Sequence, residues 1–300
     1  MRFFVTLFLL NSKWMNMKSG NFSIEVLDTG IFGLDGGAMF GVVPKALWAK
    51  AYHPGDELNR IPLSARPMLI KVDNKILLID TGNGNKMDEK FAERYGIDIE
   101  KSSPLNALLS TSVSPDEITD VILTHLHFDH AGGAAISENN KIVPTFPNAK
   151  YYVQKKHLNW ALNPTDKDRA SFVKNNFEVL LNEGLLELLD GEGELFPGIS
   201  VHPVNGHTEA MQMVKIKTGE HTFLYCADLC PTSAHINIPF VMGYDNQPLV
   251  VIEEKKKFLS QAFEENWILC FEHDAFKQAA YVNQTAKGFS AGDSVVISSL

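Results

Sequence analysis

Cysteine is scarce in this chain of 300 residues, which contains only Cys226, Cys230 and Cys270. No two of them form a CxxC pair, and each lies among apolar residues. This pattern argues against a disulfide framework and against a zinc site built from thiolates, because both need paired cysteines. We therefore predict that all three cysteines are core residues.

Positive charge is also in short supply. The chain has 27 lysines and arginines against 36 aspartates and glutamates, which gives a net charge of -9. A protein that binds nucleic acid needs a basic surface to displace counterions from phosphates, so a nucleic-acid partner is excluded. The composition favours a small-molecule substrate.

Long apolar runs are absent, since none reaches the roughly 18 residues that a membrane-spanning helix needs. Residues 1–21 begin with "MRFFVTLFLL", which has the charged and apolar start of a secretion signal but no A-x-A-like cleavage site after it. We predict an N-terminal extension over residues 1–21, with Met15 or Met17 as an alternative start. A cytoplasmic location is preferred, and secretion is the weaker alternative.

Residues 22–300 contain no repeat or linker, which predicts one domain.

Short apolar runs predict strands in both halves of the chain. They lie at Phe22 to Leu27, Met68 to Val72, Lys75 to Asp80, Asp120 to Thr124, Lys150 to Gln154, Ile199 to Val204, Met213 to Thr218, Thr222 to Ala227 and Trp267 to Glu272. Helical spacing predicts helices near Lys86 to Tyr95, Pro104 to Ser112, His157 to Leu189 and Pro248 to Glu265. This arrangement indicates an α/β fold in which helices cover sheets in layers.

Several of these predicted strands end in a side chain that can bind a metal. The segment "THLHFDH" (124–130) follows one strand, and His207, Asp228 and His273 stand at the ends of three others. If the strands point the same way in adjacent sheets, their loops meet at one edge, where a rigid scaffold usually presents its site. The sequence therefore predicts a metal site at that edge.

The ligand types and their number favour two metal ions. Imidazole and carboxylate groups suit zinc. His125 and His127 alternate with Leu126 and can point the same way, while Asp129 and His130 follow in the turn and can face a second ion. The candidate ligands are His125, His127, Asp129, His130, His207, Asp228 and His273. They overfill one tetrahedral ion but match two ions that share Asp228 as a bridge.

The segments "LLIDTGNG" (77–84), "THLHFDHAGG" (124–133), "GHT" (206–208), "ADL" (227–229) and "EHD" (272–274) give the chain a resemblance to the metallo-β-lactamase superfamily from about Phe22 onward. The resemblance implies a four-layer αβ/βα sandwich with two Zn²⁺ ions per chain. It also implies the ligand sets: His125, His127 and His207 for the first ion, Asp129, His130 and His273 for the second, and Asp228 as the bridge.

Two subgroups of the superfamily are similar to different parts of the chain. "HLHFDHAGG" resembles quorum-quenching N-acyl homoserine lactonases, and "DGGAMFGVVPKALW" (35–48) resembles methyl-parathion-hydrolase-like enzymes. Two positions depart from the pattern. The family often reads GHTPGH where this chain has "GHTEAM", and Pro231 replaces the tyrosine that some lactonases carry three residues after the bridging aspartate.

A substrate pocket is expected beside the metals. We predict that Met39 and Phe40 line it, because "GGAMFG" reads as a flexible, exposed loop that does not need two large apolar residues for packing. Phe240 could add apolar contact, and His235 could lie at the rim. Asp80, which ends a strand, could orient a ligand histidine. We expect His202 and His221 to be ordinary core or surface residues.

Together these features predict a zinc-dependent hydrolase that opens lactones or cleaves related esters with a metal-bridging hydroxide. In this prediction Asp228 bridges the metals, and Asp129 can return a proton to the leaving group. Neutral substrates are expected because the motif segments contain no lysine or arginine. The first alternative is an organophosphate hydrolase or arylesterase on the same site. An iron oxidoreductase and a metal-stabilised binding protein are the others. The resemblance also suggests a homodimer.

Overall fold

The computed structural model describes residues 22–297. The predicted extension over residues 1–21 lies outside the described residues, and the single domain predicted to follow it stays a prediction. No helix of the described part has both the length and the apolar composition needed to cross a membrane.

The first sheet has six strands in the order β1-β4-β5-β6-β9-β10. They are β1 (Phe22–Val26), β4 (Met68–Val72), β5 (Lys75–Ile79), β6 (Asp120–Ile122), β9 (Lys150–Gln154) and β10 (Leu186–Leu189). The strands β1, β4 and β5 pair antiparallel, and a turn at residues 73–74 joins β4 to β5. From β5 to β10 the strands are parallel, so the loops after β5 and β6 leave the sheet at the same edge.

The second sheet has seven strands in the order β11 to β17. They are β11 (Gly193–Phe196), β12 (Ile199–Val204), β13 (Met211–Lys217), β14 (Thr222–Tyr225), β15 (Ile268–Cys270), β16 (Ala279–Thr285) and β17 (Gly288–Val295). Only β14 and β15 pair in parallel, so their carboxyl ends also share an edge.

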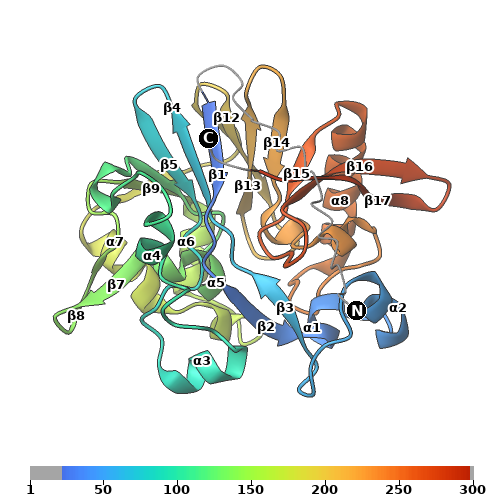
Figure 1. Ribbon diagram of the computed structural model, residues 1–300, viewed down its shortest axis with the longest axis horizontal. Helices are drawn as coiled ribbons and strands as arrows, with labels where there is room; N and C mark the ends of the chain where they lie inside the picture. Colours follow the sequence, from blue (N-terminus) through green and yellow to red (C-terminus); the bar gives the residue numbers. More distant parts are fainter. Residues whose placement is uncertain (1–21, 298–300) are drawn as a thin grey trace, which may run out of the picture.

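The two sheets pack face to face with helices on both outer faces (Figure 1). One core lies between the sheets and joins Ile70 and Ile79 of the first sheet to Val214 and Ile268 of the second. A second core joins the outer face of the first sheet to α4 (Pro104–Leu108), α6 (Lys155–Leu162) and α7 (Glu178–Asn182). A third joins the second sheet to α8 (Pro248–Glu264). This is the predicted arrangement of helix, sheet, sheet and helix.

The α8 helix shows how the sequence specifies one of these layers. Pro248 occupies its first turn, where a missing backbone N–H costs nothing. Val251, Lys255, Phe258 and Leu259 are buried at helical spacing on one face. The buried Lys255 is tolerated because its Nζ donates to the carbonyls of residues 237, 238 and 240 at 2.8, 3.2 and 2.9 Å.

The remaining elements lie in the connections between these strands and helices. They are β2 (Ile31–Asp35), α1 (Gly36–Phe40), α2 (Lys45–Ala51), β3 (Arg60–Ser64), α3 (Glu89–Tyr95), η1 (Pro115–Glu117), α5 (Phe128–Ala131), η2 (Gly132–Ala134), β7 (Ala135–Glu138), β8 (Lys141–Pro144), η3 (Arg169–Ser171), η4 (Lys174–Asn176), η5 (Ala227–Leu229) and η6 (Ser233–Ile236). The strands β2 and β3 pair with each other, as do β7 and β8.

Two predictions of local structure are wrong. The helix expected from His157 to Leu189 ends with α6 at Leu162, and after the short turns and α7 the chain forms β10, whose residues pair in parallel with β9. The expected exposed loop at "GGAMFG" is the short helix α1, capped by the side chain of Asp35, and it buries Met39 and Phe40. The three cysteines are free and buried, which confirms their place in the core.

Candidate metal centre

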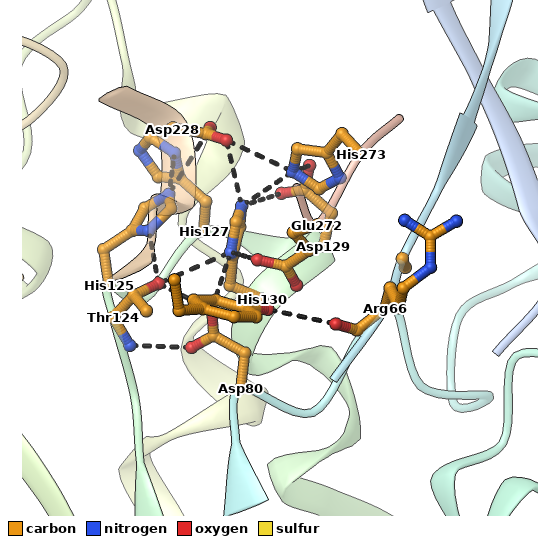
Figure 2. A network of polar contacts seen from close by, with 12 residues as sticks. Arg66, Asp80, Thr124, His125, His127, Asp129, His130, Asp228, Glu272 and His273 are labelled. Carbon is orange, nitrogen blue, oxygen red and sulfur yellow. Dashed lines mark hydrogen bonds and ion pairs between the residues drawn. The ribbon is translucent and has the colours of Figure 1, made fainter. Parts of the chain in front are cut away.

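The predicted ligands come together where the loops after β6, β12, β14 and β15 meet (Figure 2). All of them are buried or nearly so, with exposed fractions between 0% for His125 and 7% for Asp228. Asp228 lies in η5, directly after Ala227, whose φ of 45° places it in the left-handed region. A left-handed φ costs free energy in a residue that has a Cβ. Such strained conformations are common at functional sites.

The first group of ligand atoms consists of three histidines and one oxygen of Asp228. Its members are His125, His127, His207 and Asp228, with ligand atoms that all lie within 4.8 Å of one another. The His207 Nε2 is 3.1 Å from Asp228 Oδ2, and the His125 Nε2 is 3.7 Å from the same oxygen. The Nδ1 of His127 faces both, at 3.1 Å from His125 Nε2 and 3.2 Å from His207 Nε2.

The second group lies on the other side of Asp228. It consists of Asp129, His130 and His273, whose ligand atoms also lie within 4.8 Å of one another. Asp228 Oδ1 is 3.2 Å from His273 Nε2 and 3.6 Å from His130 Nε2. One carboxylate oxygen of Asp228 therefore faces each group, which is the arrangement that a bridging ligand requires (Figure 2).

The outward-facing ring nitrogens of three ligands have fixed partners. His207 Nδ1–H donates to Asp245 Oδ1 at 2.9 Å, and His273 Nδ1–H donates to the carbonyl of Ser64 at 2.8 Å. His125 Nδ1 is 3.1 Å from the hydroxyl of Thr124. In the neutral form of each ring these contacts favour the proton on Nδ1 and leave Nε2 facing the cluster, which is the tautomer that a metal ligand needs.

His130 has a carboxylate pair behind it. Its Nδ1 lies 2.8 Å from Glu272 Oε2 and 3.0 Å from Asp80 Oδ2. Asp80 itself has a left-handed φ of 56° and accepts the Thr124 backbone N–H at 2.7 Å and the Thr124 hydroxyl at 2.6 Å. The predicted orienting role of Asp80 therefore has a geometric basis, because Asp80 contacts both His130 and the start of the "THLHFDH" loop.

The electrostatics of the cluster depend on Asp228. Burial lowers the pKa values of His125 and His127 well below the ordinary value, and neighbouring histidines add to that effect. Burial also opposes charge on His207 and His273, but the carboxylate of Asp228 raises both pKa values to about 9. The charge of Asp228 thus acts on both groups.

The donor set fits two metal ions. Asp228 Oδ1 is buried without a hydrogen-bond donor. The Nε2 atoms of His130 and His273 face each other at 3.0 Å, and imidazole lone pairs placed so close need a cation or a proton to hold them together. Nitrogen and carboxylate ligands with no thiolate suit zinc or a similar borderline divalent ion.

One buried histidine joins the two loops that carry the first group. His157 on α6 accepts the Leu126 backbone N–H on Nε2 at 2.8 Å and donates from Nδ1 to the carbonyl of Glu209 at 2.7 Å. Leu126 lies between two ligands, and Glu209 lies two residues after His207. The side chain of His157 therefore fixes the spacing of three ligands without being a ligand.

A cavity of about 160 Å³ opens over the two groups. Its walls include Met39 from α1, Phe128 from α5, and the side chains of Tyr95 and Tyr244. Lys167 also lines it, so a lysine from outside the motif segments lies near the site, and its Nζ donates to the carbonyl of Tyr244 at 2.8 Å.

Three of the predicted pocket residues do not line this cavity. Phe40 is fully buried between the rings of Trp48 and His235, at centroid distances of 5.5 and 4.7 Å. His235 is buried and faces the carbonyl of Met39 through Nε2 at 2.8 Å. Phe240 packs edge to face on Phe40. Because α1 is an ordered helix, Phe40 is a packing residue, and only Met39 of the four candidates reaches the cavity.

Sequence reasoning missed Asp245, Glu272 and His157 as partners of the ligands. Glu272 precedes His273 directly, and its position next to a ligand was the available signal. Asp245 stands alone in a loop, and His157 lies in an ordinary helical pattern, so neither carried a local signal.

Comparison with known proteins agrees with this geometry. Residues 61–273 match the model of the metallo-beta-lactamase superfamily. The chain is 26% identical over 239 residues to the N-acyl homoserine lactonase AiiA of Bacillus thuringiensis subsp. kurstaki, which covers 75% of this chain and 85% of that protein.

Two solved structures share the fold over nearly the whole chain. A probable metal-dependent hydrolase from Staphylococcus aureus is 31% identical with a TM-score of 0.82, covering 93% of this chain and 100% of that one. The dizinc quorum-quenching lactonase AidC, in complex with a product, is 21% identical with a TM-score of 0.77, covering 93% and 97%. The chain therefore belongs to the metallo-beta-lactamase superfamily and is a metallo-hydrolase of that superfamily.

Proposed function

We propose that the protein is a dinuclear zinc hydrolase that opens lactones, with N-acyl homoserine lactones as the first substrates to test. The observation that carries the proposal is the pair of ligand groups that share Asp228, with one of its oxygens facing each group. The relatedness to AiiA supports the lactone assignment. A homodimer and a cytoplasmic location stay predictions.

The metals would be held by the residues already described. His125, His127 and His207 would bind the first ion, Asp129, His130 and His273 the second, and Asp228 both. Two bound ions would supply an activated water and polarise the substrate carbonyl. The chain's own residues keep the imidazole rings in the ligand tautomer through Asp245, Ser64, Thr124 and the carboxylates behind His130.

Asp129 is suited to return a proton to the leaving group. It lines the cavity, and its Oδ2 is 3.6 Å from His273 Nε2 while its Oδ1 is 3.9 Å from His130 Nε2. One carboxylate oxygen can bind the second ion, and the other can hold a proton next to the leaving oxygen of an opened ester.

Two phenols in the cavity can take the carbonyl-polarising role that Pro231 cannot fill. Tyr95 and Tyr244 both line the cavity. Burial raises the pKa of Tyr244 above its ordinary value, so its hydroxyl stays protonated and can donate a hydrogen bond to a substrate carbonyl.

The second candidate function is organophosphate or aryl-ester hydrolysis on the same centre. It is favoured by the segment 35–48, which resembles methyl-parathion-hydrolase-like enzymes and which supplies Met39 to the cavity wall. The two functions share all the ligands and differ only in the substrate that the cavity accepts.

The test is a comparison of kcat/KM on zinc-loaded enzyme for short- and long-chain N-acyl homoserine lactones, an activated aryl ester and a phosphotriester. The proposal expects lactone opening that is lost on chelation and restored by zinc. Asp228→Ala serves as the inactive control. Rapid phosphotriester turnover without lactone opening would transfer the assignment to the second candidate.

A further inference from the structure

The backbone around the ligand His273 is held by an arginine that is not itself a ligand. His273 lies in residues 271–274, which follow β15 and which we call the His273 segment. Arg66, in the connection between β3 and β4, donates from Nη1 to the carbonyl of Phe271 at 2.7 Å and from Nη2 to the carbonyl of Asp274 at 2.9 Å. These acceptors are the first and last residues of the segment. The guanidinium group therefore spans the segment, and Figure 2 shows Arg66 to one side of the ligand cluster.

Ser64, two residues before Arg66, completes this attachment. Its hydroxyl donates to the carbonyl of Glu272 at 2.7 Å, and its backbone N–H donates to the carbonyl of His273 at 3.2 Å. The carbonyl of Ser64 is also the acceptor for the His273 Nδ1–H. Every carbonyl group of the His273 segment therefore has a donor on Ser64 or Arg66.

The half-buried Arg66 is not held by an ion pair. No carboxylate of the described residues lies within ion-pair distance of its guanidinium group. Burial lowers the pKa of Arg66, and the carboxylate of Asp274 is the charge that opposes this shift most. The oxygens of Asp274 accept instead from the backbone N–H groups of residues 233, 276 and 277 at 2.8, 2.8 and 2.9 Å. Because a guanidinium group donates in fixed directions, its hydrogen bonds to two carbonyls fix where those carbonyls lie.

The His273 segment serves only the second group of ligand atoms. His273 is one ligand of that group, and Glu272 Oε2 lies 2.8 Å from Nδ1 of His130, which is another. The three histidines of the first group come from the loops after β6 and β12. A shift of the segment would therefore displace the second group and leave the histidines of the first group in place.

We propose that Arg66 is a positioning residue for the second group of metal ligands, and that its two hydrogen bonds to the ends of the His273 segment set the places of His273 and of the carboxylate of Glu272. The inference rests on the dinuclear centre of the proposed function and is independent of the substrate. Arg66 acts through backbone carbonyls, so its effect should fall on one of the two ions.

The first test measures zinc affinity by competition titration with a chelator, in wild type, Arg66→Met, Arg66→Lys and Arg60→Met. Arg60 is the matched control, because it also donates to two backbone carbonyls, those of residues 93 and 94 in α3, at 3.0 and 3.2 Å. Arg66→Met should weaken the second ion about 10- to 100-fold and the first ion less than about threefold. Arg66→Lys should recover part of this loss, since an ammonium group can still donate to a carbonyl.

Arg60→Met should leave the affinity for both ions unchanged, even if it lowers the free energy of unfolding as much as Arg66→Met does. Equal weakening of both ions in Arg66→Met would show that Arg66 supports the fold in general and would overturn the proposal. Unchanged affinity for the second ion would overturn it as well.

The second test needs neither metal nor turnover. Exchange of the His273 Nδ1–H with solvent is followed by ¹⁵N NMR in the metal-free protein, with the Nδ1–H of His207, which Asp245 accepts at 2.9 Å, as the internal reference. Arg66→Met should speed the exchange of His273 about tenfold through local opening of the segment and leave that of His207 unchanged. The same change in both rings, or in neither, would overturn the positioning role.

The two tests separate this inference from the proposed function. A wild-type protein that holds no second ion would contradict the dinuclear centre by itself. The role of Arg66 in placing His273 would then be decided by the exchange measurement alone.

Discussion

Replacing His157 with phenylalanine is expected to weaken both the fold and the first metal position, although His157 is not a ligand. The ring is fully buried and bonds the Leu126 N–H at 2.8 Å and the Glu209 carbonyl at 2.7 Å. Phenylalanine is close to histidine in size, so the change removes the two hydrogen bonds without leaving a large cavity.

The expected loss follows from those two bonds. An unpaired buried N–H at Leu126 costs about 1–3 kcal/mol, and the lost bond to the carbonyl of Glu209 adds about 0.5–1.5 kcal/mol, which gives about 1.5–4.5 kcal/mol in total. Partners that orient metal ligands typically affect metal affinity by about 10- to 100-fold, and we expect that range for the first ion.

The same residue predicts a pH effect. Burial lowers the pKa of His157 to about 4 from an ordinary value of 6.5. The unfolded chain therefore binds this proton more readily than the folded one, so the contribution of His157 to stability falls as the pH drops from about 6.5 to about 4. Over that window the loss is at most about 3 kcal/mol, and it should be missing from the phenylalanine variant.

The assay is urea unfolding of metal-free wild type and His157→Phe at several pH values, combined with competition titrations of zinc. His221→Phe, in the turn between β13 and β14, is the matched control and should stay within about 0.5 kcal/mol of wild type. If His157→Phe also stays within that margin and binds both ions normally, the role of His157 in joining the two ligand loops is refuted.

Three further predictions concern the ligands and the core. Asp228→Ala should weaken both metal positions, whereas His273→Ala should weaken only the second; equal loss in the two variants, measured by zinc titration, would contradict the bridge. Asp245→Asn should lower affinity for the first ion about tenfold, because the partner of His207 Nδ1 loses its charge. Lys255→Met should lower the free energy of unfolding by about 1–3 kcal/mol, because three backbone carbonyls lose their donor; an unchanged urea midpoint would show that water replaces it.

The strands and the clustering of the candidate ligands could be predicted because each depends on a local pattern. The apolar runs of β4, β5 and β9 are long enough to mark buried strands, and the metal-capable residues at the strand ends follow from where the runs stop. The role of each ligand still rested on the resemblance, because spacing alone cannot say which side of Asp228 a histidine will face.

What could not be predicted depends on contacts between distant segments. The run at 186–189 reads equally well as helix or strand, and parallel pairing with β9 decides it. Phe40 was expected in the pocket, because a segment rich in glycine gave no sign of the Asp35 cap that folds it into α1. His207 and its partner Asp245 are 38 residues apart, so only the folded chain shows the pair.

The most direct test of the central claim is the metal content of the purified protein, measured by elemental analysis together with activity before and after chelation. Two ions per chain are expected, with lactone or ester hydrolysis that disappears on chelation and returns when zinc is added. A single tightly held ion with full activity, or activity that survives complete removal of metal, would contradict the dinuclear account.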